Sequence, residues 1–137
     1  MFALVLGDLD HFKLINDRHG HQVGDRVLVE TAERLRHVSR SGDTVARIGG
    51  EEFAWILPGA DMDVAVASAE RLCAVISSGP LAGDVGTSIS VGVAVFEPTM
   101  NAEQLFTSAD AALYEAKHAG RDRVAIARGG RAVTTTT

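Results

Sequence analysis

The sequence predicts an α/β domain in which helices flank a mixed central sheet. Three observations predict it. Apolar β-prone runs alternate with segments of helical periodicity along the chain. Two short β-prone runs near the middle are joined by a turn with two glycines, which is typical of a β-hairpin. The length of 137 residues and the hydrophobic content of 46% suit one globular domain with a substantial core.

Composition narrows the class of protein. The formal charge of −5 argues against a nucleic-acid polymer as partner, because such a surface is basic. The one cysteine, Cys73, cannot form an internal disulfide, which fits a reducing cytoplasm, and it is expected as a buried, inert thiol. No apolar run is long enough to span a membrane, so no membrane insertion is expected from this segment, although the parent protein is compatible with a membrane anchor.

The first strand is predicted at residues 2–6, where the sequence is continuously apolar. Asp8 and Asp10 follow it, two residues apart, and can therefore share a face. Carboxylates at the end of a buried strand are one way to hold a divalent metal. The alternative is helix capping. We prefer capping for Asp10, as N-cap of a helix over 11–16, and metal binding for Asp8.

A polar, glycine-containing loop is predicted over residues 16–25, followed by a helix from Asp25 to about His37. His19 and His21 lie in that loop without a third ligand at suitable spacing, so loop packing is preferred to metal binding.

The hairpin is predicted from strands at 44–46 and 53–57, with Arg47–Phe53 as the connection. Gly49 and Gly50 permit positive φ and leave the backbone bare. Glu51 and Glu52 add two carboxylates at the tip, which suits metal ions and a phosphorylated ligand. Taken alone, this stretch is better explained as a solvated acidic turn.

The second half contains a helix capped by Asp61, a strand over 89–95 with strict alternation, and a helix opened by an Asn101–Gln104 capping box and ended near Gly120. A short strand is predicted at 123–127. Residues 1–128 are thus predicted as the domain, and 129–137 as a disordered tail.

Five blocks together resemble the GGDEF-domain diguanylate cyclases, in their GGEEF form. The blocks are Asp8–Asp17, Gly20-His21 with Gly24-Asp25, Arg47–Phe53, Ser88–Val93, and Ala109–Lys117 with Gly120-Arg121. The resemblance implies a palm-like sheet related to nucleotidyl cyclases. It also implies that two GTP molecules condense to cyclic di-GMP and two pyrophosphates.

The resemblance implies a site with two Mg²⁺ or Mn²⁺ ions. By position, Asp8, Glu51, Glu52 and the Leu9 carbonyl are the expected ligands, and Glu51 also assists deprotonation of the attacking 3′-hydroxyl. Two metals clamped by carboxylates suit phosphoryl transfer, which needs in-line placement and charge neutralisation.

The expected substrate-binding residues are also assigned by position in the family. Asn16 and Asp25 match the guanine-recognising positions, and Lys117 and Arg121 match the cations that hold the terminal phosphates. Placement near a helix C-terminus is the alternative for these two cations. The remaining substrate-binding assignments are Lys13, the backbone around Phe12, and Gly49 and Gly50, which leave room for phosphates.

Arg40 and Asp43 match the Arg-x-x-Asp product-inhibition site of the family, and Arg71 is a further candidate contact. A local Arg–Asp pair is the alternative. We favour the regulatory interpretation because of the spacing to the hairpin, and because arginine can bond guanine O6 and N7 together.

Family members usually carry a segment before the first strand that links to a sensor. The sequence is therefore expected to be a module of a longer chain with an upstream sensor, here without that lead segment. One site holds one GTP, so turnover is expected to need a homodimer. The competing hypotheses are a catalytically silent receptor for GTP or cyclic di-GMP and, less favoured, a polymerase or other nucleotidyl-cyclase palm.

Overall fold

The computed structural model describes residues 1–128 and 131–134. A six-stranded mixed sheet runs through its centre in the order β2-β3-β1-β4-β5-β6. In chain order the elements are β1 (Phe2–Leu9), α1 (Phe12–His19), α2 (His21–Val38), β2 (Thr44–Arg47), β3 (Glu52–Pro58), α3 (Met62–Ser77), β4 (Ile89–Val95), α4 (Ala102–His118), β5 (Arg123–Arg128) and β6 (Arg131–Thr134).

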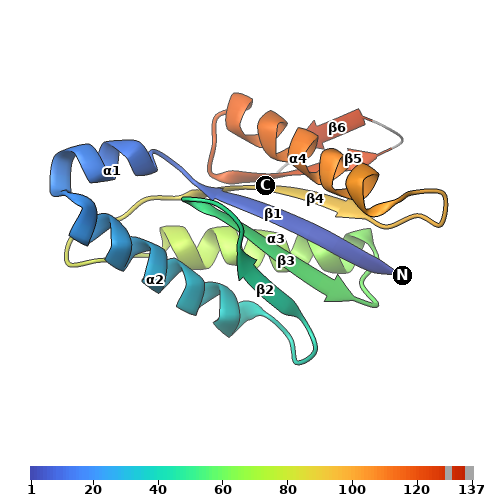
Figure 1. Cartoon of the computed structure of the whole chain (residues 1–137), viewed down its shortest axis with the longest axis horizontal. Coiled ribbons are helices and arrows are strands. Elements are labelled where there is room, and N and C mark those ends of the chain that lie inside the picture. The colour runs from blue at the N-terminus through green and yellow to red at the C-terminus, as the bar shows by residue number, and fades with distance from the viewer. Residues whose placement is uncertain (129–130, 135–137) are drawn as a thin grey trace.

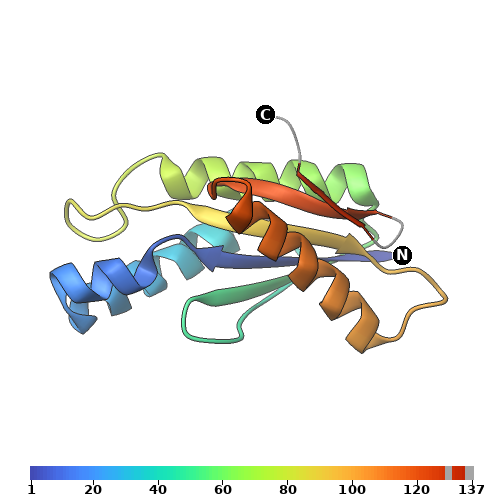
Figure 2. The ribbon, with the colours of Figure 1, turned by 90° about the horizontal axis from the view of Figure 1, so that it is seen from above.

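The helices form two layers around the sheet, as Figures 1 and 2 show. Helices α2 and α3 cover one face, and α4 covers the other. Alternate side chains of β1 supply both cores: Val5 packs with the α2–α3 side, and Leu6 packs with Leu113 on the α4 side. A strand buried on both faces needs a continuous apolar run, which the start of the sequence has.

Strand β1 is the centre of the arrangement. It pairs antiparallel with β3 on one side and with β4 on the other, while β4 and β5 run parallel. The β1–β3 register places Asp8 opposite Glu52, and the β1–β4 register places Asp8 opposite Ser90. The end of β1 therefore meets the beginning of the hairpin's second strand and the beginning of β4.

Several predicted elements are confirmed. The hairpin, the strand over 89–95 and the fifth strand are present. The side chain of Asp61 caps α3 by accepting from the Val64 amide at 2.9 Å. Asn101 and Gln104 form the full capping box of α4. Cys73 is buried, and burial raises the pKa of its thiol to about 12, as expected of an inert cysteine.

The predicted loop over 16–25 is wrong. Helices α1 and α2 follow one another with only Gly20 between them, at a φ of 87°. Glycine takes this left-handed region at little cost, so one residue is enough to turn the chain. The polar side chains that indicated a loop lie on helices.

The chain end also differs from the prediction. Residues 131–134, within the segment predicted to be a disordered tail, form β6, which pairs antiparallel with β5. The rest of that segment, 129–130 and 135–137, lies outside the described residues.

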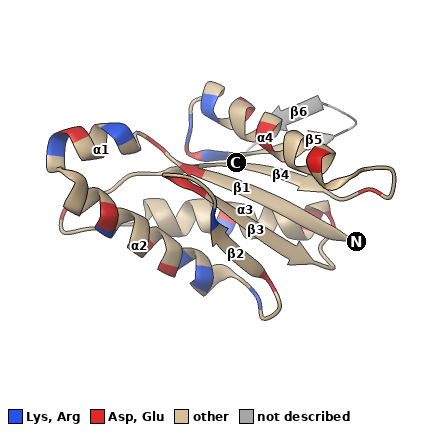
Figure 3. Cartoon of the chain, in the orientation of Figure 1, with Lys and Arg blue, Asp and Glu red and all other residues tan. Residues whose placement is uncertain are grey.

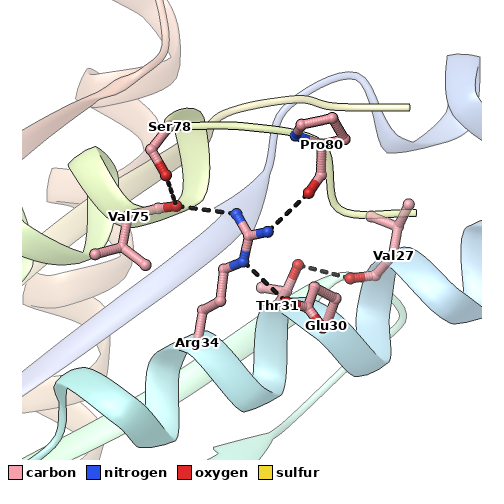
Figure 4. A network of polar contacts seen from close by, with 7 residues as sticks. All are labelled: Val27, Glu30, Thr31, Arg34, Val75, Ser78 and Pro80. Atoms are coloured by element: carbon pink, nitrogen blue, oxygen red, sulfur yellow. Dashed lines mark hydrogen bonds and ion pairs between the residues drawn. The ribbon is translucent and has the colours of Figure 1, made fainter. Parts of the chain in front are cut away.

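Arg34 ties α2 to the end of α3 (Figure 4). Its guanidinium donates to the Val75 carbonyl at 3.0 Å, to the Pro80 carbonyl at 2.7 Å and to Glu30 at 3.1 Å. Carbonyls at a helix C-terminus have no partner within the helix, so a cation there satisfies them. The contact fixes how α3 sits beside α2.

Within the described residues, no helix combines the length and the apolar character needed to cross a membrane.

Candidate active site

A cleft of about 530 Å³ opens where β1 ends. Its walls come from the end of β1, the beginning of α1, the hairpin turn and the end of α4. Figure 3 shows the acidic positions at the end of β1 and the start of β3 side by side. The residues lining the cleft are Asp8, Leu9, Asp10, His11, Phe12, Lys13, Leu14, Asp17, Glu51, Lys117 and Arg121. Segments far apart in the sequence thus meet at one end of the central strand β1.

Asp8 is the most buried of the predicted carboxylate ligands, with 7% of its surface exposed. Its Oδ2 atom lies 3.0 Å from Lys117 Nζ. Burial raises the pKa of the Asp8 carboxyl, and the hydrogen bond and charge of Lys117 lower it without cancelling the increase. A nearby cation therefore stabilises the ionised form of Asp8.

Glu51 and Glu52 are half-buried beside Asp8. The pKa of each is raised, first by burial and then by repulsion from the Asp8 carboxylate. Asp110 on α4 adds to the repulsion on Glu52. A divalent cation would relieve this repulsion, since hard cations bind carboxylate oxygens.

The oxygen ligands of the cleft suit a metal ion that completes its coordination shell with other groups. Within the described part of the chain, no three His, Cys, Asp or Glu side chains are grouped closely enough to hold a metal by themselves. Two carboxylates, Asp8 and Glu51, line the cleft together with Leu9. The Leu9 amide donates a hydrogen bond to the Glu51 carbonyl at 3.3 Å. Mg²⁺ characteristically uses one or two carboxylates and completes its shell with water and phosphate oxygens. The residues fit such an ion.

The two glycines of the hairpin turn, Gly49 and Gly50, were predicted to permit positive φ, but the turn does not use that freedom. Neither Gly49 nor Gly50 has a positive φ, so the turn does not require glycine for its conformation. A Cβ added at Gly50 would meet no atom within 4 Å, and one at Gly49 would make only an ordinary contact with Glu52. The fold would accept alanine at both positions, and the bare backbone faces open space.

The predicted phosphate-binding residues are brought together. Phe12, Lys13, Lys117 and Arg121 all line the cleft that Asp8 and Glu51 line. Arg121 lies in the turn after α4, which ends at His118, and donates to the Lys117 carbonyl at 3.4 Å.

The two predicted guanine-binding residues lie elsewhere. Asn16 is on α1, and its Oδ1 atom is buried without a hydrogen-bond partner. Gly24 packs so closely against the Asn16 side chain that a Cβ at Gly24 would lie 1.8 Å from this oxygen. Asp25 is exposed on α2 and lines a separate groove with Arg47. Neither Asn16 nor Asp25 lines the cleft.

Arg40 and Asp43 form the local pair that was the alternative interpretation. Arg40 Nη2 lies 3.1 Å from Asp43 Oδ1 and donates to the Pro58 carbonyl at 2.9 Å. Asp43 also accepts from the Arg40 amide at 2.8 Å and from Trp55 Nε1 at 3.0 Å, and these bonds hold the pKa of Asp43 below its usual value despite burial. Among the described residues, no hydrogen bond or ion pair joins Arg71, on α3, to either of them.

Sequence reasoning misplaced Asp10. It is not the N-cap of α1: His11 holds that position, with no side-chain cap. Asp10 is instead 2% exposed, and its carboxylate accepts from Ser88 and Ser90. Ser88 and Ser90, on the same face at the start of β4, could have indicated that a buried acceptor lies nearby. The sequence could not show which acceptor they meet.

Comparisons with known proteins show the family of the chain. The family model "Diguanylate cyclase, GGDEF domain" matches residues 1–123. Diguanylate cyclase DgcM of Escherichia coli (strain K12) is 41% identical over 126 residues, which cover 92% of this chain and 31% of DgcM. Uncharacterized protein YhcK of Bacillus subtilis (strain 168) is 46% identical over 130 residues, covering 90% of this chain and 36% of YhcK. The chain thus spans about a third of the length of these two curated relatives.

Solved structures show the same fold. The GGDEF domain of DgcB from Caulobacter crescentus, in complex with c-di-GMP, superimposes with a TM-score of 0.88 at 36% identity, covering 92% of this chain and 77% of that one. The active GGEEF domain of a diguanylate cyclase from Vibrio cholerae gives a TM-score of 0.87 at 31% identity, covering 93% and 83%. On the family match, these identities and the shared fold, the chain belongs to the GGDEF domain family of diguanylate cyclases.

Proposed function

We propose that this domain condenses two GTP molecules to cyclic di-GMP, releasing two pyrophosphates. One observation carries the proposal. Asp8 at the end of β1 and Glu51 in the hairpin turn line the same cleft as Lys117 and Arg121. Carboxylates for metal ions and cations for phosphates are the parts that phosphoryl transfer requires.

The carboxylates of Asp8, Glu51 and Glu52 and the carbonyl of Leu9 would hold two Mg²⁺ or Mn²⁺ ions. Such ions, when bound, lower the pKa of the attacking hydroxyl and neutralise charge on the phosphate oxygens. The raised pKa of all three side chains supports this role, because each gains from a nearby cation.

The other cleft residues bind and orient the nucleotide. Lys117 and Arg121 hold the terminal phosphates, and Lys13 and the backbone at Phe12 add contacts. Gly49 and Gly50 leave space beside the phosphates, consistent with their open surroundings. Glu51 accepts the proton of the 3′-hydroxyl as its oxygen attacks the α-phosphate of the second GTP.

Guanine is recognised by Asn16 and Asp25. The buried, unpaired Oδ1 of Asn16 supports this assignment, because a buried acceptor without a partner is costly unless a ligand satisfies it. Guanine offers N1–H and N2–H donors on one edge, to which a carboxylate and an amide oxygen are matched. Adenine lacks that pair of donors and would be rejected.

Turnover requires a homodimer in which two domains face each other, since each site supplies one of the two GTP molecules. The relatives that this chain matches are about three times its length, which supports an upstream sensor domain in the parent protein. A cytoplasmic location fits the free, buried Cys73.

The test is to incubate concentrated protein with GTP and Mg²⁺ or Mn²⁺ and to measure cyclic di-GMP by chromatography. We expect product from the wild type, with a rate per protomer that rises with protein concentration, and none from Glu51→Gln. Undiminished turnover by Glu51→Gln would remove Glu51 from the mechanism. GTP binding without product in the wild type would favour a silent receptor instead.

We further propose that Arg40 and Asp43 form a product-inhibition site, with Arg71 as an additional contact. The Arg40 side chain is 41% exposed and its bonds to Asp43 and Pro58 use one terminal nitrogen, which leaves the other nitrogens for a guanine edge. Arg40→Ala should relieve inhibition by added cyclic di-GMP. Equal inhibition of both proteins would count against the site.

A further inference from the structure

Asp10 is a buried carboxylate that binds three donors from two distant parts of the chain. Its Oδ1 accepts from Ser90 Oγ at 2.6 Å. Its Oδ2 accepts from Ser88 Oγ at 2.5 Å and from the backbone amide of Asp122 at 3.0 Å. Both oxygens are thus engaged inside the fold, and the third bond reaches the turn that follows α4.

That turn has an unusual backbone. Gly120, Arg121 and Asp122 have φ values of 123°, 64° and 47°. For a residue other than glycine this left-handed region is unfavourable, and such a conformation persists where surrounding contacts hold it. The Arg121 amide donates to the Ala116 carbonyl at 3.0 Å, and the Asp122 amide donates to Asp10. The turn is therefore held to α4 at one residue and to Asp10 at the next.

The first of these two anchored residues, Arg121, carries the side chain that reaches the cleft. Arg121 lines it with Asp8 and Lys117, and its charge lowers the pKa of Asp8. Asp8 lies at the end of β1 and Asp10 directly follows the strand, so a predicted metal ligand and the anchor of this turn are two residues apart.

We propose that Asp10 is a positioning residue, which places Arg121 on the terminal phosphates of the nucleotide by holding the Asp122 amide. The proposal rests on the function proposed above. Asp10 acts through hydrogen bonding and not through its charge. Removing a negative charge near phosphates would by itself strengthen phosphate binding, so a weaker affinity without Asp10 reports the lost hydrogen bond.

The experiment measures GTP and GMP affinity, with Mg²⁺ present, by calorimetry. Asp10→Ala should weaken GTP binding about tenfold, the loss expected for one charge-assisted contact, and leave GMP binding unchanged because GMP lacks the terminal phosphates. Asp10→Asn should stay within about twofold of wild type: its amide oxygen can accept from Asp122 while its NH₂ donates to Ser90. In an Arg121→Ala background, Asp10→Ala should cause no further loss. Asp61→Ala, which removes a helix-capping carboxylate far from the cleft, is the matched control.

Three results would overturn the proposal. These are equal loss of GTP and GMP affinity in Asp10→Ala, a loss in Asp10→Asn as large as in Asp10→Ala, or the full effect persisting without Arg121. Wild-type protein that binds neither nucleotide would overturn the proposed function itself, and this inference with it. Should Asp10→Ala not fold, amide hydrogen exchange decides: slow exchange at Asp122 in wild type and Asp10→Asn supports the anchor, and fast exchange in wild type overturns it.

Discussion

Lys117 Nζ lies 3.0 Å from Asp8 Oδ2, joining the last turn of α4 to the end of β1 across the cleft. The Lys117 ammonium stabilises the charge of the buried Asp8 carboxylate. The pair therefore links the predicted phosphate-binding face of the site to its predicted metal-binding face.

Replacing Lys117 with methionine should raise the pKa of Asp8. Burial already raises that pKa, and Lys117 is the largest influence that lowers it. The side-chain carboxyl ¹³C resonance of Asp8 should therefore titrate at higher pH in Lys117→Met than in wild type. Lys13→Met, which removes another cleft lysine, should leave it nearly unchanged. An Asp8 titration unaffected by Lys117→Met would contradict the ion pair.

Two glycines should respond oppositely to alanine. A Cβ at Gly92 would lie 2.3 Å from both the Ala109 carbonyl oxygen and the Leu113 amide nitrogen, which are backbone atoms of α4. Gly92→Ala should cost about 3 kcal/mol or more of unfolding free energy, because α4 must move off the sheet. At Gly50 the added Cβ meets nothing, so Gly50→Ala should change stability by less than about 0.5 kcal/mol.

Gly50→Ala should nevertheless weaken GTP binding, since its Cβ would project into the space proposed for the phosphates. Urea unfolding and calorimetric titration with GTP separate the two effects. A Gly50→Ala protein with wild-type GTP affinity would show that the turn does not approach the nucleotide.

Asp43 should stabilise the fold in a pH-dependent way. Its side chain is 1% exposed and its pKa is lowered in the folded state. A lowered pKa means that the stabilisation is present above the unfolded value, about 3.9, and is lost as pH falls through the folded value. Asp43→Ala should cost about 2–4 kcal/mol at pH 7, with the difference from wild type shrinking below pH 4.

The matched control for Asp43 is Glu33→Ala. Glu33 pairs with Arg36, but the two side chains are 63% and 61% exposed. Such a pair contributes at most about 1 kcal/mol. Equal losses from the two substitutions, measured by urea unfolding at pH 7, would contradict the structural role of Asp43.

Glu52→Gln should stabilise the metal-free protein at neutral pH. The folded state raises the pKa of Glu52, so between the unfolded and folded values the folded state binds more protons than the unfolded state. Stability contributed by this group therefore falls as pH rises through that window. We expect a gain of about 0.5–1 kcal/mol at pH 7 that disappears below about pH 4. Glu115→Gln, an exposed site on the same domain, should show no such gain in thermal unfolding.

The sequence was sufficient for most of the fold, and it indicated Asp8 and Glu51 as two carboxylates that the structure brings to one cleft. Strand periodicity, the hairpin turn and the caps at Asp61 and Asn101 act within a few residues, so they can be recognised locally. The position of Asp8 at the end of a doubly buried strand, and of Glu51 in a turn, likewise followed from local pattern.

Tertiary structure alone decided the partners of those residues. Asp10 resembles a helix cap in the sequence, yet its donors lie 78, 80 and 112 positions away. The pairing of Asp43 with Trp55 depends on how the hairpin folds back over the preceding turn. A residue's local preferences act over one helical turn or one strand. A buried charged group takes whichever donors the folded chain brings to it, because leaving it unpaired costs more than those preferences contribute.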